Sequence, residues 1–146
     1  MWYYKSQPFN TENFIDTDYI GFVYCVTDNE NGMKYIGKKN FYSKIRKPPL
    51  KGKTRKRTLI RESDWRVYCG SSAEVKSLVE QHGLSRFYRE IIHLCKSKGE
   101  MSYLEMKEQI TRDVLLKPNE YYNSFVGGKI HRSHLKRLHI TEALDK

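Results

Sequence analysis

Two tyrosines on either side of a predicted turn are the first candidates for chemistry. Tyr24 and Tyr35 each lie within a short stretch rich in aromatic and β-branched residues, and an Asn-Gly pair between them signals a tight turn. This pattern predicts an antiparallel hairpin with both phenols on one exposed face, close to being cross-strand partners. Lys38 and Lys39 follow at once, and a cation beside a phenol lowers its pKa, so that the phenol can act as a general base on water.

The basic residues are concentrated in one segment. The chain of 146 residues has 27 Lys or Arg and 17 Asp or Glu, a net charge of +10, yet residues 38–61 hold eleven cations and no acid. Such a segment favours a polyanion, with nucleic acid first and an anionic membrane surface second. Its two prolines and one glycine exclude the regular amphipathic helix that a membrane surface would need. We therefore expect an exposed, basic loop that binds nucleic acid, and no stretch of the chain is apolar enough to span a bilayer.

Hydrophobic patterns and turn signals predict an α+β domain around the hairpin. We expect strands over 19–27, 33–37 and 85–94 and helices over 72–82 and 102–116. These form a small three-stranded antiparallel sheet flanked by helices, with one domain over 1–126 and a basic tail over 127–146 that includes a short basic helix. Three widely spaced cysteines are most simply core side chains with reduced thiols.

Two local patterns refine the helices. The first helix follows Ser71-Ser72-Ala73-Glu74, which has the spacing of a capping box. The second places Tyr103, Met106, Ile110 and Val114 on one stripe.

The hairpin residues also resemble a known family. Gly21-Phe22-Val23-Tyr24, then ten residues, then Tyr35-Ile36-Gly37-Lys38 resembles the two signature motifs of the GIY-YIG nucleases. Asp64-Trp65, Gly70-Ser71-Ser72 and a helical Leu104-Glu105 extend the likeness to the phage homing-endonuclease branch. The resemblance covers about Tyr19 to Asn123 and implies hydrolysis of DNA phosphodiester bonds with one divalent metal, Mg²⁺ or Mn²⁺.

The resemblance also implies roles for individual residues. Glu105 matches the metal-binding glutamate, Tyr24 and Tyr35 match the two tyrosines, one of which activates water, and Lys38 and Asn123 match further residues of the active site. The family usually carries an arginine on a helix about eight residues after the YIG glycine, where this chain has Ile45. Lys39, Arg46 or Arg66 would supply that charge, with Lys39 and Arg46 ranked first.

The remaining cations are expected to hold the DNA phosphate backbone. They come from the basic loop and the tail: Lys44, Lys47, Lys51, Lys53, Arg55, Lys56, Arg57, Arg61, Lys129, Arg132, Lys136 and Arg137. A dimer on DNA is one arrangement that would give double-strand cleavage. The resemblance places the protein in the cytoplasm of a phage-infected bacterium.

Structural alternatives stand beside these assignments. One alternative is that the two tyrosines are simply packed aromatics. Another is that Glu105 closes a capping box with Ser102, three residues before it. His131 and His134 form part of a zinc site, or they contact phosphate. Trp65 is a packing anchor. For the whole protein, the alternatives are a nucleic-acid-binding module without catalysis and a nuclease for RNA or branched DNA.

Overall fold

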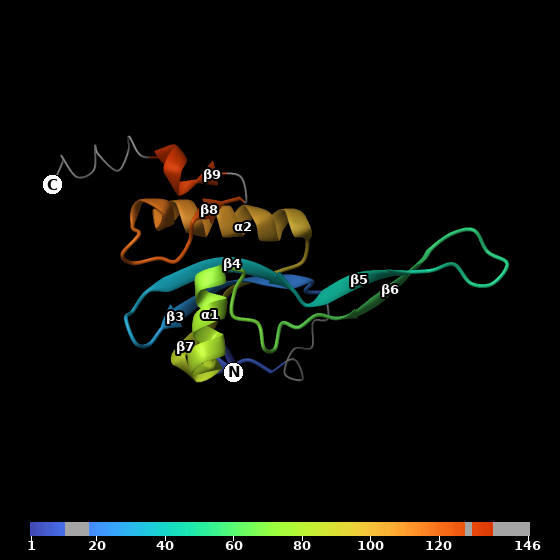
Figure 1. The fold of residues 1–146 in the computed structure, drawn as a ribbon, viewed down its shortest axis with the longest axis horizontal. Coiled ribbons are helices and arrows are strands. Elements are labelled where there is room, and N and C mark those ends of the chain that lie inside the picture. The colour runs from blue at the N-terminus through green and yellow to red at the C-terminus, as the bar shows by residue number, and fades with distance from the viewer. Residues whose placement is uncertain (11–17, 128–129, 136–146) are drawn as a thin grey trace.

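A five-stranded mixed sheet lies at the centre of the molecule, in the order β2-β1-β7-β3-β4 (Figure 1). The computed structural model describes residues 1–10, 18–127 and 130–135. The strands of this sheet are β1 (Trp2–Tyr4), β2 (Gln7–Pro8), β3 (Gly21–Asp28), β4 (Lys34–Asn40) and β7 (Phe87–Cys95). The predicted α+β class is confirmed.

The sheet is larger than predicted. Strands β7, β3 and β4 pair antiparallel and correspond to the three predicted strands. The N-terminal chain adds two more, because β1 pairs parallel with β7 and antiparallel with β2. These strands are two or three residues long, too short to display the alternation that marks a strand in a sequence.

The two helices cover opposite faces of the sheet. On one face, Phe22, Tyr24 and Val26 of β3 pack with Val75 of α1 (Ala73–His82). On the other, Val23 and Cys25 pack with Met101 of α2 (Lys98–Thr111). Strand β3 is therefore buried on both sides, which explains its nearly continuous apolar sequence. All three cysteines are buried, as predicted.

The helix boundaries correct two predictions. Helix α1 begins after Ser72, whose hydroxyl accepts from the Val75 amide at 3.3 Å, so the Ser71–Glu74 capping box does not form. Helix α2 begins four residues before the predicted start, because Ser97 is its N-cap and accepts from the Glu100 amide at 3.1 Å. Three residues of the predicted stripe are exposed: Tyr103, Met106 and Ile110.

The basic segment is not a loop for most of its length. Strands β5 (Tyr42–Lys47) and β6 (Arg57–Glu62) pair antiparallel as a separate two-stranded sheet that extends away from the body (Figure 1). Pro48, Pro49 and Gly52 lie in the turn between the strands, so these helix-breaking residues do not interrupt either strand.

The C-terminal part of the described chain lies beside α2. Strands β8 (Phe125–Val126) and β9 (Ile130–His131) form a short antiparallel pair, followed by a 3₁₀ turn over Arg132–Leu135. The predicted basic helix is therefore a strand and one turn within residues 130–135, and its other positions lie outside the described residues. Among the described residues, no helix is both long and apolar enough to cross a membrane.

A buried ion pair fixes the end of β3. The Asp28 side chain is fully buried and accepts from Arg86 at 2.8 and 3.0 Å and from the Tyr122 hydroxyl at 2.7 Å. Its Oδ1 also accepts from the Glu30 amide in the turn at 2.9 Å. This cluster ties the β3–β4 turn to the segment that carries Asn123.

Candidate active site

A cleft of about 720 Å³ lies at the outer edge of β4, where α1 and α2 approach that strand from opposite faces. Its polar lining comes from β4, from α1 and the segment before it, from α2, and from the segment on either side of Asn123: Tyr35, Lys38, Ser71, Ser72, Glu74, Glu105, Gln109, Tyr122 and Ser124. The cleft thus brings together one predicted tyrosine, one predicted lysine and the predicted metal-binding glutamate.

The two tyrosines share a face, as predicted, but differ in accessibility. Tyr24 pairs with Gly37 and Tyr35 pairs with Val26, so the phenols are diagonal neighbours with ring centroids 6.3 Å apart. The predicted exposed face is wrong, because Tyr24 is 1% exposed. A Cβ on Gly37 would collide with the Tyr24 phenol, so only glycine lets this ring lie across β4.

Burial raises the pKa of both phenols. For Tyr24 the pKa lies well above its ordinary value because of burial and its neighbours Tyr68 and Tyr35. For Tyr35 burial outweighs the opposing hydrogen bond with Ser71, whose hydroxyl lies 2.6 Å away. The prediction that nearby lysines lower these pKa values is therefore wrong for the protein as described.

Glu105 reaches the sheet edge from α2. Burial raises the pKa of its carboxyl, although the Lys38 charge and a hydrogen bond from the Lys38 backbone N–H act in the opposite direction. The alternative that Glu105 closes a capping box is wrong, since the helix begins at Lys98. The Ser102 hydroxyl instead accepts from Lys38 Nζ at 2.8 Å.

The two neighbouring lysines point to opposite faces of β4. Lys38 lies on the α2 side, whereas Lys39 Nζ lies 2.5 Å from the Asp64 carboxylate and 4.0 Å from the centre of the Tyr68 ring. Among the described residues that line the cleft, Lys38 is the one cation.

The structure does not bring the arginine candidates to the cleft. Arg46 lies on β5 opposite Thr58. Arg66 pairs with Glu62 at 2.7 Å and lies over the Trp65 ring. After Gly37 the chain continues into the β5–β6 hairpin, so Arg46 lies on that hairpin and does not line the cleft.

Groups from the C-terminal half of the chain form successive hydrogen bonds along the outer edge of β4. The Lys34 amide donates to Glu120 O, and Lys34 O accepts from the Tyr122 amide. Asn123, 1% exposed, accepts from the Ile36 amide at 3.0 Å and donates to Ile36 O at 2.8 Å. The Lys38 amide and Glu105 come next along this edge. Asn123 therefore fixes the strand on which the site is built.

Sequence reasoning missed Gln109 and Ser71. Gln109 follows Glu105 by one helical turn, which is a sequence signal for the same helix face. Its side chain is buried and donates to Ile36 O at 3.1 Å. Ser71 belongs to the Gly70-Ser71-Ser72 match, but its contact with Tyr35, 36 residues away in the chain, has no signal in the sequence.

The donors present suit a hard divalent ion. Within the described residues, no cluster of three or more His, Cys, Asp or Glu side chains is arranged to hold a metal. The cleft instead offers the Glu105 carboxylate, and Gln109 Oε1 is buried with no hydrogen-bond partner in the part of the chain that the structure describes. A carboxylate and an amide oxygen are ligands that Mg²⁺ accepts together with water and phosphate oxygens.

The predicted DNA-binding cations belong to the β5–β6 hairpin or to the C-terminal tail. Those from Lys44 to Arg61 lie on the β5–β6 hairpin and its turn, all of them exposed. Arg132 is engaged internally, since its guanidinium donates to Leu115 O at 2.7 Å and to Asn123 O. Lys129, Lys136 and Arg137 lie outside the described residues.

Comparison with family models gives a match over most of the chain. A family model described as "Putative endonuclease segE, GIY-YIG domain" matches residues 2–126. No curated protein and no solved structure matches the chain significantly.

Proposed function

Because the chain belongs to the SegE-type family of GIY-YIG endonuclease domains, we propose that it hydrolyses DNA phosphodiester bonds with Mg²⁺ or Mn²⁺ in the cleft beside β4. The observation that carries this proposal is the convergence of Tyr35, Lys38 and Glu105 on one cleft from elements far apart in sequence. We place the nuclease domain at 1–126, with 127–146 as a basic tail.

In this proposal, Glu105 and Lys38 have different electrostatic roles. Glu105 would hold the divalent ion, and Gln109, one turn later on the same helix, adds an amide oxygen to the lining of the cleft. The ion, when bound, supplies Lewis-acid stabilisation of the phosphate's non-bridging oxygens. Lys38, held by the Ser102 hydroxyl, lies within the same cleft to stabilise the developing negative charge.

Tyr35 is the tyrosine that we assign to the attacking water. Its side chain lines the cleft and hydrogen-bonds with Ser71, whereas Tyr24 is buried behind Gly37. A phenol with a raised pKa is mostly protonated at neutral pH, so a neighbouring cation is needed before it can accept a proton. Tyr24 is a positioning residue that packs against Tyr35.

The test is plasmid cleavage with Mg²⁺ or Mn²⁺ by the wild type and by Glu105→Gln. The substitution keeps the shape of the side chain and removes its charge, so we expect cleavage to fall by at least about a hundredfold. Glu80→Gln, an exposed substitution on α1, is the matched control and retains the wild-type rate.

Three outcomes contradict parts of the proposal. If the wild type binds DNA and never cuts with any divalent metal, the protein is a binding module. If Glu105→Gln cuts at the full rate, the metal ligand lies elsewhere. Cleavage of RNA or of branched DNA in preference to plasmid duplex would redirect the substrate assignment.

A further inference from the structure

The β5–β6 hairpin has cations on both faces and no core beneath it. Among the described strands, β5 and β6 pair only with each other, and every residue of β6 is exposed. The register places Lys44 and Arg46 on one face and Lys47, Arg57 and Arg61 on the other. An isolated two-stranded hairpin is only marginally stable in water, so this ribbon gains little from its own packing.

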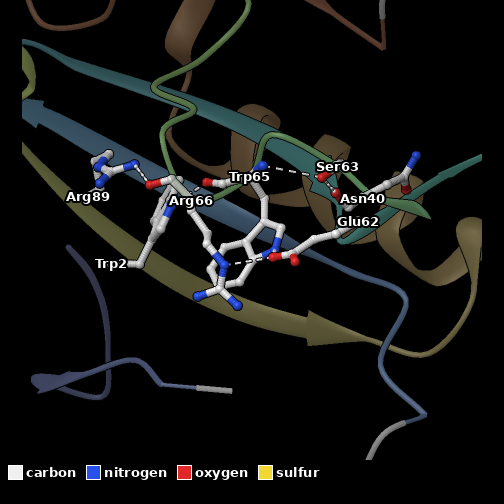
Figure 2. Close-up of polar contacts among 7 residues, drawn as sticks. All are labelled: Trp2, Asn40, Glu62, Ser63, Trp65, Arg66 and Arg89. Atoms are coloured by element: carbon white, nitrogen blue, oxygen red, sulfur yellow. Dashed lines mark hydrogen bonds and ion pairs between the residues drawn. The ribbon is translucent and has the colours of Figure 1, made fainter. Parts of the chain in front are cut away.

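The charge distribution within the ribbon opposes its own stability. Lys47 and Arg57 are direct cross-strand partners, and like charges in that position repel. The single acid of the two strands, Glu62, is engaged at the base of the hairpin, where it accepts from Trp65 Nε1 at 2.8 Å and Arg66 Nε at 2.7 Å (Figure 2). The outer ribbon therefore needs a polyanion to offset its repulsion.

Burial and hydrogen bonds hold the base of the ribbon against the body. Trp65 is 3% exposed, and its amide and the Asn40 carbonyl both hydrogen-bond the Ser63 hydroxyl, at 3.3 and 2.5 Å (Figure 2). Arg89 donates to Arg66 O and Tyr68 O at 2.9 Å each, which fixes the following chain. The ribbon is thus anchored to the end of β4, the strand that carries Lys38.

These observations, taken with the proposed function on which the inference rests, support a role of the β5–β6 hairpin in DNA recognition. We propose that the β5–β6 hairpin enters the major groove of B-form DNA about one helical turn from the cut phosphate. The major groove, about 12 Å wide, accepts a two-stranded ribbon. The major groove of A-form RNA is too narrow, so the ribbon selects duplex DNA.

The distance between the cut phosphate, beside Lys38, and the ribbon follows from the strand geometry. Lys38 and Lys47 are nine residues apart along β4 and β5, which spans at most about 30 Å at 3.3 Å per residue. That length corresponds to about nine base pairs at 3.4 Å each. The turn over 48–56, with Lys51, Lys53, Arg55 and Lys56, extends the reach further.

The experiment measures groove occupancy without cleavage. Binding to a DNA duplex is followed by fluorescence anisotropy in EDTA, with methyl green occupying the major groove or netropsin occupying the minor groove. We expect methyl green to weaken wild-type binding at least tenfold and netropsin to weaken it less than twofold. The reverse order of sensitivity would overturn the proposal.

Variants then assign that sensitivity to the ribbon. In one, an Asn-Gly turn replaces residues 46–58 and joins Ile45 to Leu59, which are already direct cross-strand partners. The other is Lys47→Gln with Arg57→Gln, which removes the cross-strand repulsion and so preserves the fold. Both are expected to lose the methyl green effect, whereas the charge-matched Lys98→Gln with Lys107→Gln on α2 keeps it. Retention of the effect in both ribbon variants would disprove the assignment.

The outcome is separable from that of the proposed function. A protein that shows the ribbon-dependent methyl green effect but never cuts keeps the inference and loses the nuclease assignment. A protein that cuts plasmid while its ribbon variants bind like the wild type keeps the nuclease assignment and loses the inference.

Discussion

Tyr35 has a hydroxyl at the cleft, and its pKa is raised by burial. We predict that Tyr35→Phe lowers the single-turnover rate of plasmid cleavage by about 10²–10⁴-fold, the usual contribution of a general acid or base. The ring packing is retained, so the thermal midpoint changes little. Tyr103→Phe, an exposed phenol on α2, serves as the control. Cleavage at the wild-type rate by Tyr35→Phe would transfer the role to another group.

Asp28 lies at the end of β3 and joins three segments through its carboxylate. We predict that Asp28→Asn lowers the free energy of unfolding by about 3–5 kcal/mol, because Arg86 is then left without its charged partner. Urea denaturation at pH 7 measures this change, with Glu80→Gln as a control that is neutral within about 0.5 kcal/mol.

The same carboxyl gives the stability a defined pH dependence. Burial acts to raise the pKa of Asp28, but the hydrogen bonds from Arg86 and Tyr122 outweigh it, and the net pKa lies below its ordinary 3.8. The stabilisation is present above that value and is lost as the pH falls through the lower folded-state pKa. The wild type is therefore expected to lose more stability than Asp28→Asn between pH 5 and 2.

Elements with local signals could be predicted from the sequence. Helix α1 begins within one residue of the expected position, because Ser72 caps its start and Gly83, with a φ of 84°, follows its end. The start of α2 was predicted four residues too late, because Ser97 is its N-cap. The ribbon was missed because prolines and dense charge are loop signals, and its strands have no buried face to create alternation.

For the site as well, local sequence motifs could be predicted, but contacts between distant residues could not. The motifs that carry Tyr35, Lys38 and Glu105 are visible along the chain. The position of the Gln109 side chain depends on a contact with Ile36, 73 residues away in the chain. The position of Arg46, away from the cleft, depends on the direction of the ribbon. Such contacts arise from packing, which a single sequence does not display.

At the scale of the whole molecule, the net charge of +10 is a property of one projecting element rather than of the body. We predict that replacing Lys53, Arg55, Lys56 and Arg57 with Gln reduces the slope of log K against log salt by about 3–4 in magnitude. Each phosphate contact contributes about 0.9 to that slope. Anisotropy titrations between 50 and 300 mM salt measure it, and an unchanged slope would mean that these cations do not contact phosphate.

The two ends of the ribbon meet on the body of the protein. The Ser63 amide donates to Phe41 O at 2.8 Å and its hydroxyl to Asn40 O at 2.5 Å, so the chain leaves and rejoins the body at one point. Whatever lies between these residues can change in length or sequence without moving β4 or the cleft. Residues 43–61 therefore form a modular segment, which can be exchanged for another hairpin while the residues that line the cleft keep their positions.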